Sequence, residues 1–491
     1  MTTTSHTPPD GAPRTRPAEL QEHERRRGMR YVYYAAVLGI IYFFAINGNV
    51  FTLFLKRLGA GNTQIGMVLS LLQLAAVVQI FVARMIEHRG KKRFIIGGWL
   101  VATTLSIGYL GVPFLAARYG SSAAVYILMA MVVPVALARQ IAIPGWMPLL
   151  NDVVPPDIRG RFFGKMRTIW QLASIAFLIF ASLFFAGAAS APFWRYQVIF
   201  VIGILASYAR VAVIARIPEP PPPAADKAPS VWSTINLPFA DNVYVRFVVF
   251  SALVTVALAM TDSYTVVYLK SAALNYDDSH ALFVSTGIFY IGSAAALILW
   301  GILADKVGSR PLLVINTLGI GLVRFLWLPA AHPGWGRFLI PLFYFLNGVF
   351  AAGFGIANTK YLFSITPRHF GKATYIVMAN VSVTLVSALF TPLGGFVIDG
   401  LSAYATGLAQ YGLDEYRLPF LASGAMVIIA SVLIARFKER DAVPTREVLQ
   451  AMVARPAQTL YNLFLFRRPL SGRMNDSSDD DKNADLPPPA P

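Results

Sequence analysis

Cysteine is absent from this chain of 491 residues, which excludes disulfides, thiolate nucleophiles and cysteine-ligated metal sites. Charged residues are scarce, at 14% of the chain, whereas soluble domains average about 25%. The six histidines are isolated from one another, so we expect neither a zinc site nor any other cofactor. Residues 1–30 lack an apolar core beside a cleavage site, and we therefore expect the first helix to direct membrane insertion.

Acidic residues are also few, with 25 Asp and Glu against 42 Lys and Arg and a net charge of +17. In a soluble protein this excess would suggest nucleic acid as a partner. Here the basic residues gather in alternate loops between apolar runs, which is the pattern of the positive-inside rule. It predicts a multi-pass protein of a bacterial-type inner (plasma) membrane with both termini cytoplasmic, and no nucleic-acid partner.

Apolar residues are abundant, at 56% of the chain, and the mean hydropathy is +0.56. A membrane-spanning helix needs about 20 such residues. Continuous apolar runs, which exclude alternating β-strands, begin at about Tyr31, Gln64, Phe94, Ser122, Met166, Trp194, Tyr244, Ala281, Pro311, Phe338, Ala373 and Leu418. The sequence therefore predicts an all-α membrane protein of twelve transmembrane helices in two six-helix bundles.

A polar stretch with four consecutive prolines, Pro220 to Pro223, separates the sixth and seventh runs and cannot be helical. Beyond Arg436 the chain leaves the predicted membrane, first as an amphipathic helix and then as a disordered tail. The predicted organisation is a disordered cytoplasmic tail at 1–30, bundles at 31–217 and 244–437, a cytoplasmic linker at 218–243 and a cytoplasmic extension at 438–491.

The two halves resemble each other in their loops. The loop after the second run reads Glu87-His88-Arg89-Gly90-Lys91-Lys92, and the loop after the eighth reads Asp305-Lys306-Val307-Gly308-Ser309-Arg310. Phe163-Gly164-Lys165 before the fifth run likewise recurs as Phe370-Gly371-Lys372 before the eleventh. These matches indicate an internal duplication.

The segment from Gly301 to Arg310 fits the pattern G-x-x-x-D-(R/K)-x-G-x-(R/K) and resembles the signature loop of the major facilitator superfamily. Gly308 permits a tight turn, and the Asp305 carboxylate is suited to accept hydrogen bonds at a helix N-terminus. The resemblance, which covers residues 31–437, implies that this is the eleventh helix, near Gly371. We expect a conformational latch formed by Gly301, Asp305, Gly308, Arg310 and, from the degenerate first copy, Glu87 and Gly90.

The resemblance also implies that the first, fourth, seventh and tenth helices line a central cavity. Polar groups inside a membrane are costly and are candidates for binding; on these helices they are Asn47, Asn49, Arg139, Gln140, Asp262 and Asn347. Arg139 is suited to an anionic group, and Asp262 to a cation or a proton. The alternatives are that Arg139 snorkels, that Asp262 reaches water or pairs with Lys270, and that the asparagines form interhelical hydrogen bonds.

Two arginines lie on helices that the resemblance places outside the cavity. Arg210 is interpreted as a snorkelling residue, whereas the sequence offers no account of the deeper Arg324. The segment from Gly160 to Met166 differs from a phosphate-binding loop, because the glycines are one residue too close and Met166 replaces the hydroxyl that binds Mg²⁺. We therefore expect gradients, and not ATP, to supply energy.

The predicted function is a monomeric secondary transporter that moves a small organic solute by alternating access, with proton coupling and uniport both open. No nucleophile and base can be assembled into an active site, so an enzyme is not expected. One alternative is a lipid or lysolipid transporter with a lateral opening. Another is a non-transporting membrane sensor whose output is the extension from Arg440.

Overall fold

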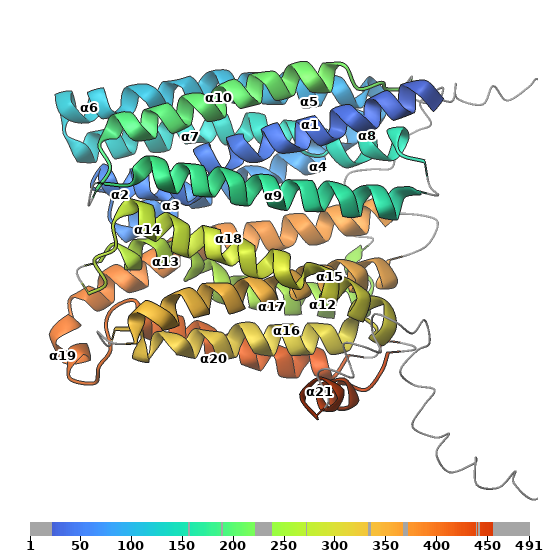
Figure 1. Cartoon of the computed structure of the whole chain (residues 1–491). Coiled ribbons are helices and arrows are strands. Elements are labelled where there is room, and N and C mark those ends of the chain that lie inside the picture. The colour runs from blue at the N-terminus through green and yellow to red at the C-terminus, as the bar shows by residue number, and fades with distance from the viewer. Residues whose placement is uncertain are drawn as a thin grey trace, which may run out of the picture.

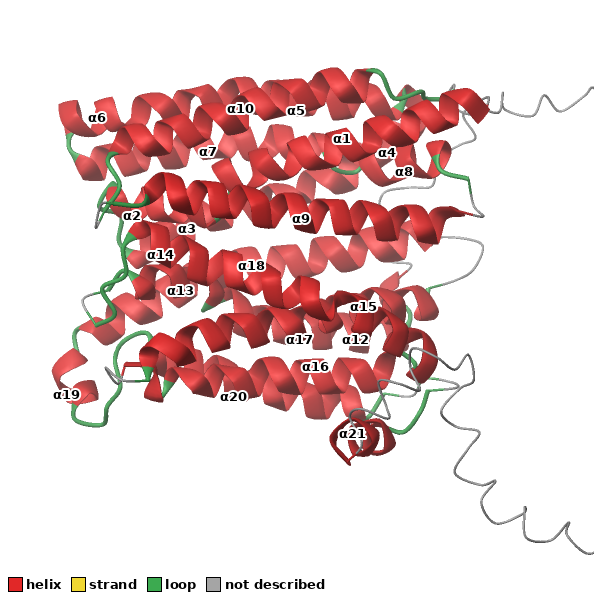
Figure 2. Cartoon of the chain, viewed as in Figure 1, coloured by secondary structure: helices red, strands yellow, loops and turns green. Residues whose placement is uncertain are grey.

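The computed structural model describes residues 22–155, 158–187, 190–220, 238–271, 273–331, 335–366, 372–437, 439 and 442–454. Within these ranges the chain forms helices and loops and no strand (Figure 2). Twelve helical segments of the described chain are long and apolar enough to cross a membrane, which confirms the number predicted from the apolar runs. Residues 1–21 of the tail predicted at 1–30, residues 455–491 of the extension predicted at 438–491 and most of the proline-rich linker lie outside the described residues. Residues 22–30, which were predicted to belong to a disordered tail, instead form the first turns of α1.

The first six spans are built from ten helices, several of them joined end to end. These are α1 (Glu22–Ile46), α2 (Asn49–Arg57), α3 (Asn62–Leu74), α4 (Val78–Arg89), α5 (Lys91–Ser106), α6 (Val112–Tyr119), α7 (Ser121–Ala142), α8 (Trp146–Val153), α9 (Arg159–Phe185) and α10 (Phe193–Ala215). Short 3₁₀ turns connect α3 to α4 (Ala75–Val77) and α5 to α6 (Ile107–Gly111).

The last six spans contain α12 (Asn242–Ala259), α13 (Asp262–Leu269), α14 (Asp278–Leu282), α15 (Phe289–Val307), α16 (Ser309–Val323), α17 (Gly336–Ile365), α18 (Lys372–Ser402) and α20 (Arg417–Ala435). A π-helical turn, Phe283–Ile288, joins α14 to α15, and 3₁₀ turns follow α16 at Arg324–Trp327 and Pro329–Ala331. Two further helices lie outside the spans, α19 (Ala405–Ala409) and α21 (Thr445–Ala454).

The spans run side by side and define two faces of the molecule (Figure 1). We call the end at which α1 begins and α20 ends the near face, and the end that carries α6 and α19 the far face. The helices of residues 22–215, coloured blue to green, lie on one side, and those of residues 242–435, coloured yellow-green to red, lie on the other. The chain thus consists of two six-span halves.

The first span of each half is interrupted inside the membrane. Asn47 and Gly48 separate α1 from α2, and Gly48 is extended, with φ −87° and ψ −162°. Met260 and Thr261 separate α12 from α13, and Thr261 has φ −129° and ψ −44°. Irregular backbone at membrane depth is tolerated where protein or a water-filled cavity surrounds it. We therefore infer that the irregular backbone at both breaks faces the protein interior and not lipid.

The two halves contact each other mainly through their far-face portions. α3, the far part of the second span, packs extensively along α18, and α2 packs against α13. α9 also contacts α14 and the π-helical turn that follows it. The near part of the second span, α4, contacts α18 much less. The far face is therefore the closed side of the boundary between the halves.

The segment after the last span docks onto the second half. The backbone N–H of Val443 donates to the carbonyl of Val307 at 3.0 Å, and α21 packs against α16 with Val448 only 2% exposed. The amphipathic helix predicted after Arg436 therefore begins as a helix packed on protein, and its predicted continuation beyond Ala454 lies outside the described residues.

Candidate functional site

Arg139 on α7 and Asn47 at the break after α1 meet in the first half. A terminal guanidinium nitrogen of Arg139 donates to the side-chain oxygen of Asn47. The fourth span continues through α8 to Val153, so Arg139 lies near its middle and not close to an end. Arg139 lies in the last turn of α7, in the later part of its helix as the sequence placed it, and α8 continues the span beyond it. The Nε of Arg139 and the Nδ2 of Asn47 are buried without a hydrogen-bond partner.

Gln140 and Asn49 serve helix packing in this conformation. The buried Gln140 accepts a hydrogen bond from Gln79 at 2.5 Å and donates to the Leu72 carbonyl at 3.3 Å, which joins two spans of one half. Asn49 crosses between the halves and donates to the hydroxyls of Ser285 (3.1 Å) and Thr286 (2.6 Å) in the π-helical turn. Gln140 thus connects helices of one half, and Asn49 makes interhelical hydrogen bonds, the alternative given for the asparagines, across the boundary between the halves.

Asp262 pairs with Arg324, the arginine for which the sequence offered no account. The Arg324 side chain is 0% exposed and donates both to Asp262 and, at 2.9 Å, to the hydroxyl of Thr261. The Asp262 side chain remains 44% exposed. Lys270, the partner considered from the sequence, instead pairs with Asp278 at 2.8 Å. Asp262 therefore neutralises a buried cation and still presents an accessible carboxylate.

Asn347 and Arg210 complete the predicted polar set. Asn347 is half-buried on α17 and forms no hydrogen bond with another described residue. Arg210 does not snorkel as predicted, because its guanidinium lies over the ring of Trp99 at 4.3 Å and near that of Trp146 at 5.6 Å. Such cation–π contacts stabilise a guanidinium away from water. Among the described residues, the side-chain hydrogen bond that joins two of the six predicted binding residues runs from Arg139 to Asn47.

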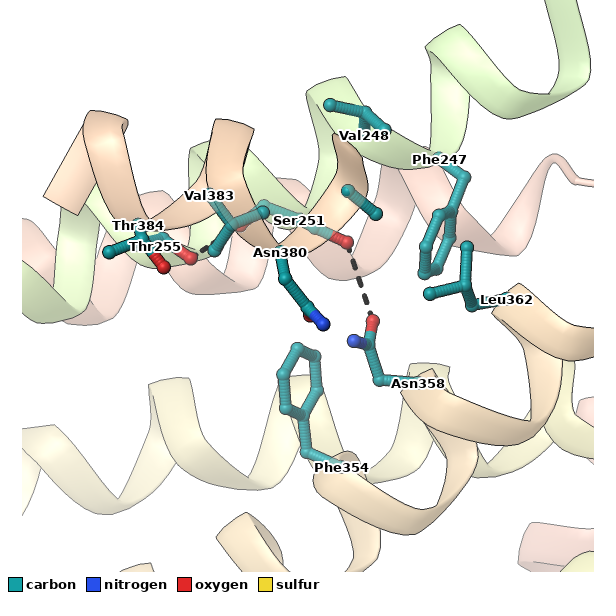
Figure 3. A pocket seen from close by; sticks show the side chains of 11 residues that line it. Phe247, Val248, Ser251, Thr255, Phe354, Asn358, Leu362, Asn380, Val383 and Thr384 are labelled. Carbon is teal, nitrogen blue, oxygen red and sulfur yellow. Dashed lines mark hydrogen bonds between the residues drawn. The ribbon is translucent and has the colours of Figure 1, made fainter. Parts of the chain in front are cut away.

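A pocket of about 140 Å³ lies in the second half, between α12, α17 and α18 (Figure 3). Its polar lining is uncharged, and Ser251 donates to the side-chain oxygen of Asn358 at 3.3 Å. Asn380 points toward Asn358, beside the ring of Phe354 (Figure 3). The sequence reasoning missed these residues because it weighed ionisable groups first, although amides inside apolar runs are themselves a signal of polar contacts between helices.

A glutamate caps a helix at the same place in each half, on the near face. Glu219, after α10, accepts from the backbone N–H of Lys91 at 2.5 Å, and Glu439, after α20, accepts from the backbone N–H of Arg310 at 2.6 Å. The preceding turns use Gly90 and Gly308 with positive φ of 85° and 90°. A carboxylate at a helix N-terminus binds the unpaired N–H groups and complements the helix dipole.

Of the residues predicted for the latch, Gly90, Gly308 and Arg310 take part in these caps, whereas Asp305 does not. Asp305 pairs with Lys360 at 2.9 Å and is 83% exposed, while Glu439 provides the helix cap, and the capped helix is the ninth span. The predicted partner near Gly371 and the side chain of Glu87 lie outside the described residues, and Gly301 has open space around it. A repeat that the sequence reasoning overlooked marks both caps, with Ile214-Ala215-Arg216 and Glu219 recurring as Ile434-Ala435-Arg436 and Glu439.

Asp399 joins the two halves at the far face. Its carboxylate, on α18, accepts from the Asn62 amide at 2.8 Å and from the backbone N–H and hydroxyl of Thr63 at 2.8 and 2.6 Å. It thus caps α3 from the opposite half. Charge-assisted hydrogen bonds of this kind are about twice as strong as neutral ones. The sequence reasoning did not single out this residue.

Asp278 makes a second connection between the halves at the far face. One of its oxygens accepts from the Ala191 N–H at 2.6 Å and from the Tyr196 hydroxyl at 2.7 Å, while the other pairs with Lys270. The neighbouring Asp277 caps only its own helix. Burial acts to raise the pKa of Asp277, but hydrogen bonds from the backbone and ring of His280 hold the pKa below its usual value.

Comparisons with known proteins agree on one family. The sequence matches the family model described as Major Facilitator Superfamily over residues 32–286 and again over 253–471. No curated protein matches the sequence.

Solved transporter structures resemble the whole membrane part of the chain. A bacterial homologue of the human lysosomal transporter Spinster, in an inward-facing and occupied conformation, has a TM-score of 0.65 at 13% identity over 86% of this chain and 99% of that one. A D-xylose–proton symporter has a TM-score of 0.64 at 15% identity (86% and 98%). The nucleoside transporter NupG has a TM-score of 0.59 at 15% identity (84% and 100%). At these identities the likeness shows the fold, and it confirms the predicted fold class.

Proposed function

The chain belongs to the major facilitator superfamily, and from this premise we propose that it is a secondary transporter of a small organic solute. The observation that supports this most is the uneven boundary between the halves. Extensive contacts and the carboxylates of Asp399 and Asp278 join the halves at the far face, whereas the near parts contact less. Alternating access requires such a boundary, which closes on one side and parts on the other.

The moving bodies in this proposal are the predicted bundles, residues 31–217 and 244–437. Rocking of one bundle against the other breaks the Asp399 cap on α3 and opens the far face. The breaks in the first and seventh spans place short far-face helices, α2 and α13, against each other across the boundary. We propose that the near face is cytoplasmic, following the positive-inside rule, and that the described conformation is open toward the cytoplasm.

Asp262 is the proposed proton carrier if transport is coupled to protons. Its carboxylate is accessible, and its partner Arg324 is fully buried. Protonation of Asp262 would leave the guanidinium without its counter-charge, so protonation and the packing around the break in the seventh span are energetically linked. In this proposal the solute binds between the bundles, Asp262 takes up and releases the proton, and the protein acts as a monomer.

Ligand-induced stabilisation of the purified protein tests the proposal. A solute at a hundred times its dissociation constant adds about 2.7 kcal/mol to the stability of the native state. We expect members of a metabolite panel to raise the unfolding temperature and to cross liposome membranes that contain the protein. Absence of any shift across the panel, together with movement of labelled lipids across the same liposomes, would instead support the lipid transporter.

A further inference from the structure

The first half of the chain has almost no acidic residues. Between residues 31 and 217 the only carboxylates in the sequence are those of Glu87, Asp152 and Asp157, and all three fall at or after the ends of the predicted apolar runs. Asp152 is already paired with Lys91. The middle of this half therefore offers no carboxylate to any cation placed there.

Two arginines nevertheless lie inside this half. Arg139 is near the middle of the fourth span, and Arg210 lies on α10 against Trp99. No ion pair among the described residues includes either guanidinium, and the nearest protein acceptor of Arg139 is the neutral side chain of Asn47. A charge inside a membrane protein is costly unless it is paired, and such residues commonly mark a substrate path.

The second half does not supply the missing charge. Asp262 is the carboxylate nearest the middle of its spans, and Arg324 already occupies it. Asp399 and Asp278 are bound at the far face. The described carboxylates that face the boundary between the halves are therefore all committed to other partners.

The buried atoms of Arg139 and Asn47 that lack a hydrogen-bond partner are both donors. The Asn47 oxygen is taken by Arg139, which leaves the Asn47 Nδ2 without an acceptor, and the Arg139 Nε is also buried without one. An amide N–H beside a guanidinium suits the oxygens of a carboxylate or a phosphate, which accept several hydrogen bonds at once. A neutral solute would satisfy the hydrogen bonds but would leave the charge uncompensated.

Arg210 strengthens this preference without binding the solute itself. Its guanidinium is held over aromatic rings and close against Gly39 of α1, where an added Cβ would approach its Nε to 2.9 Å. It therefore contributes a fixed positive charge to the interior of the same half. Fixed charges in a site shielded from water raise the local concentration of ions of opposite sign.

We infer that the transported solute is a small organic anion, whose carboxylate or phosphate group binds Arg139 and the Asn47 amide as their missing acceptor. This rests on the proposed transport function and adds the chemical class of the solute.

The absence of native cysteine allows a direct test of the charge at this site. Asn47→Cys introduces the only thiol of the chain. Its reaction rates are measured with two methanethiosulfonate reagents, the anionic sulfonatoethyl and the cationic trimethylammonioethyl form, each divided by its rate with 2-mercaptoethanol. Both reagents attack the same thiolate, so their ratio reports the local potential. We expect the anionic reagent to react at least about tenfold faster in relative rate.

Further variants separate this inference from effects on folding and from transport. Arg139→Gln in the Asn47→Cys background should lower the ratio severalfold, to the smaller anion preference left by the fixed charge of Arg210, and Arg139→Lys, which keeps the charge, should preserve most of it. Asn380→Cys in the uncharged pocket serves as the matched control with a ratio near unity. The inference would be overturned if the thiol at position 47 reacted equally with both reagents, faster with the cationic one, or with neither. It would also be overturned if Arg139→Gln left the ratio of the two rates unchanged. The assay needs no turnover, so its result is independent of whether transport is detected.

Discussion

At the scale of single residues, the two halves treat their buried cations differently. In the second half, Arg324 binds Asp262, and Lys270 binds Asp278. In the first half, Arg139 binds only the neutral Asn47, and no acid is available to it. We interpret Arg324 and Lys270 as structural or coupling elements, and Arg139 as the place where a solute supplies the counter-charge.

Asp262→Asn should lower the free energy of unfolding, because it leaves the fully buried Arg324 without an anionic partner. Breaking a buried pair costs about 3–5 kcal/mol, and the 44% exposure of Asp262 reduces this to about 1–3 kcal/mol. Thermal unfolding in detergent measures the loss. The double variant Asp262→Asn/Arg324→Gln should recover most of it, and a double variant no more stable than the single one would contradict the pairing.

Asp399→Ala should shift the molecule toward a state open at the far face, since it removes the acceptor for the N–H and hydroxyl of Thr63. Charge-assisted hydrogen bonds are worth about 1.5–3 kcal/mol, so the open population should rise about tenfold or more. Distances between spin labels across the far face measure the change. Asp241→Ala is the matched control, because Asp241 also caps a helix, α12, but does so within its own half and at the near face. Equal effects of both substitutions would argue against a far-face latch.

At the scale of helices, each half repeats one device at the near face. A glycine with positive φ ends one span, the next begins at once, and a glutamate after the last span of the half caps it. The device connects the third span to the sixth, and the ninth to the twelfth. It therefore stabilises each bundle internally and leaves the boundary between the bundles free to move.

Glu219→Ala and Glu439→Ala should each lower the free energy of unfolding by about 1–2 kcal/mol, because each removes a helix cap and its interaction with the helix dipole. Differential scanning fluorimetry of the purified variants provides the measurement. Gln450→Ala, at an exposed position in the middle of α21, is the control and should leave stability unchanged, because it removes neither a cap nor a charge at a helix end. If the cap variants behave like this control, the caps do not stabilise the bundles.

α15 and α17 cross with their backbones in close contact, and glycine allows the approach. A Cβ at Gly348 would lie 2.0 Å from the Phe289 carbonyl oxygen, and a Cβ at Gly292 would lie 2.1 Å from that of Phe345. A Cβ at Gly355, on the same helix as Gly348, would meet nothing within 4 Å. Small residues at such crossings let membrane helices pack tightly.

Gly348→Ala should therefore destabilise the second half by about 1–3 kcal/mol through overpacking, whereas Gly355→Ala should be tolerated or slightly stabilising. Both substitutions place the same methyl group on one helix, so intrinsic helix propensity cancels in the comparison. Thermal unfolding of both variants measures the difference, and the unfolding temperature of Gly348→Ala should be the lower one. A Gly348→Ala variant as stable as Gly355→Ala would show that the crossing has room to relax.

The twelve spans could be predicted from the sequence because lipid imposes long apolar runs, and the repeated loops could be predicted because their glycines are local features. The helix breaks at Gly48 and Thr261 could not be predicted from the sequence, because the neighbouring helices determine whether irregular backbone is buried. The pairing of Asp262 with Arg324 also depends on the packing of two spans far apart in sequence. The caps at Glu219 and Glu439 were within reach of sequence reasoning, through a repeat that was overlooked.

At the scale of the whole molecule, two six-span halves meet at a boundary that is closed at the far face. Which face is closed follows from small differences among many contacts, including the capping of α3 by Asp399. Such an equilibrium shifts with a few kcal/mol, and no local pattern in the sequence determines its position. Binding of a solute between the bundles supplies free energy on this scale. In the proposed mechanism, this free energy shifts the protein from the state open at one face to the state open at the other.

Pulsed electron paramagnetic resonance on the chain, which contains no native cysteine, tests this account most directly. One pair of spin labels, at Tyr119→Cys and Tyr411→Cys, spans the far face, and a second pair, at Gly164→Cys and Asn242→Cys, spans the near face. The account predicts two distances for each pair, with reciprocal changes: conditions that lengthen the far-face distance shorten the near-face one. A single unchanging distance at both faces, in every solute and pH condition, would contradict alternating access and support a non-transporting role.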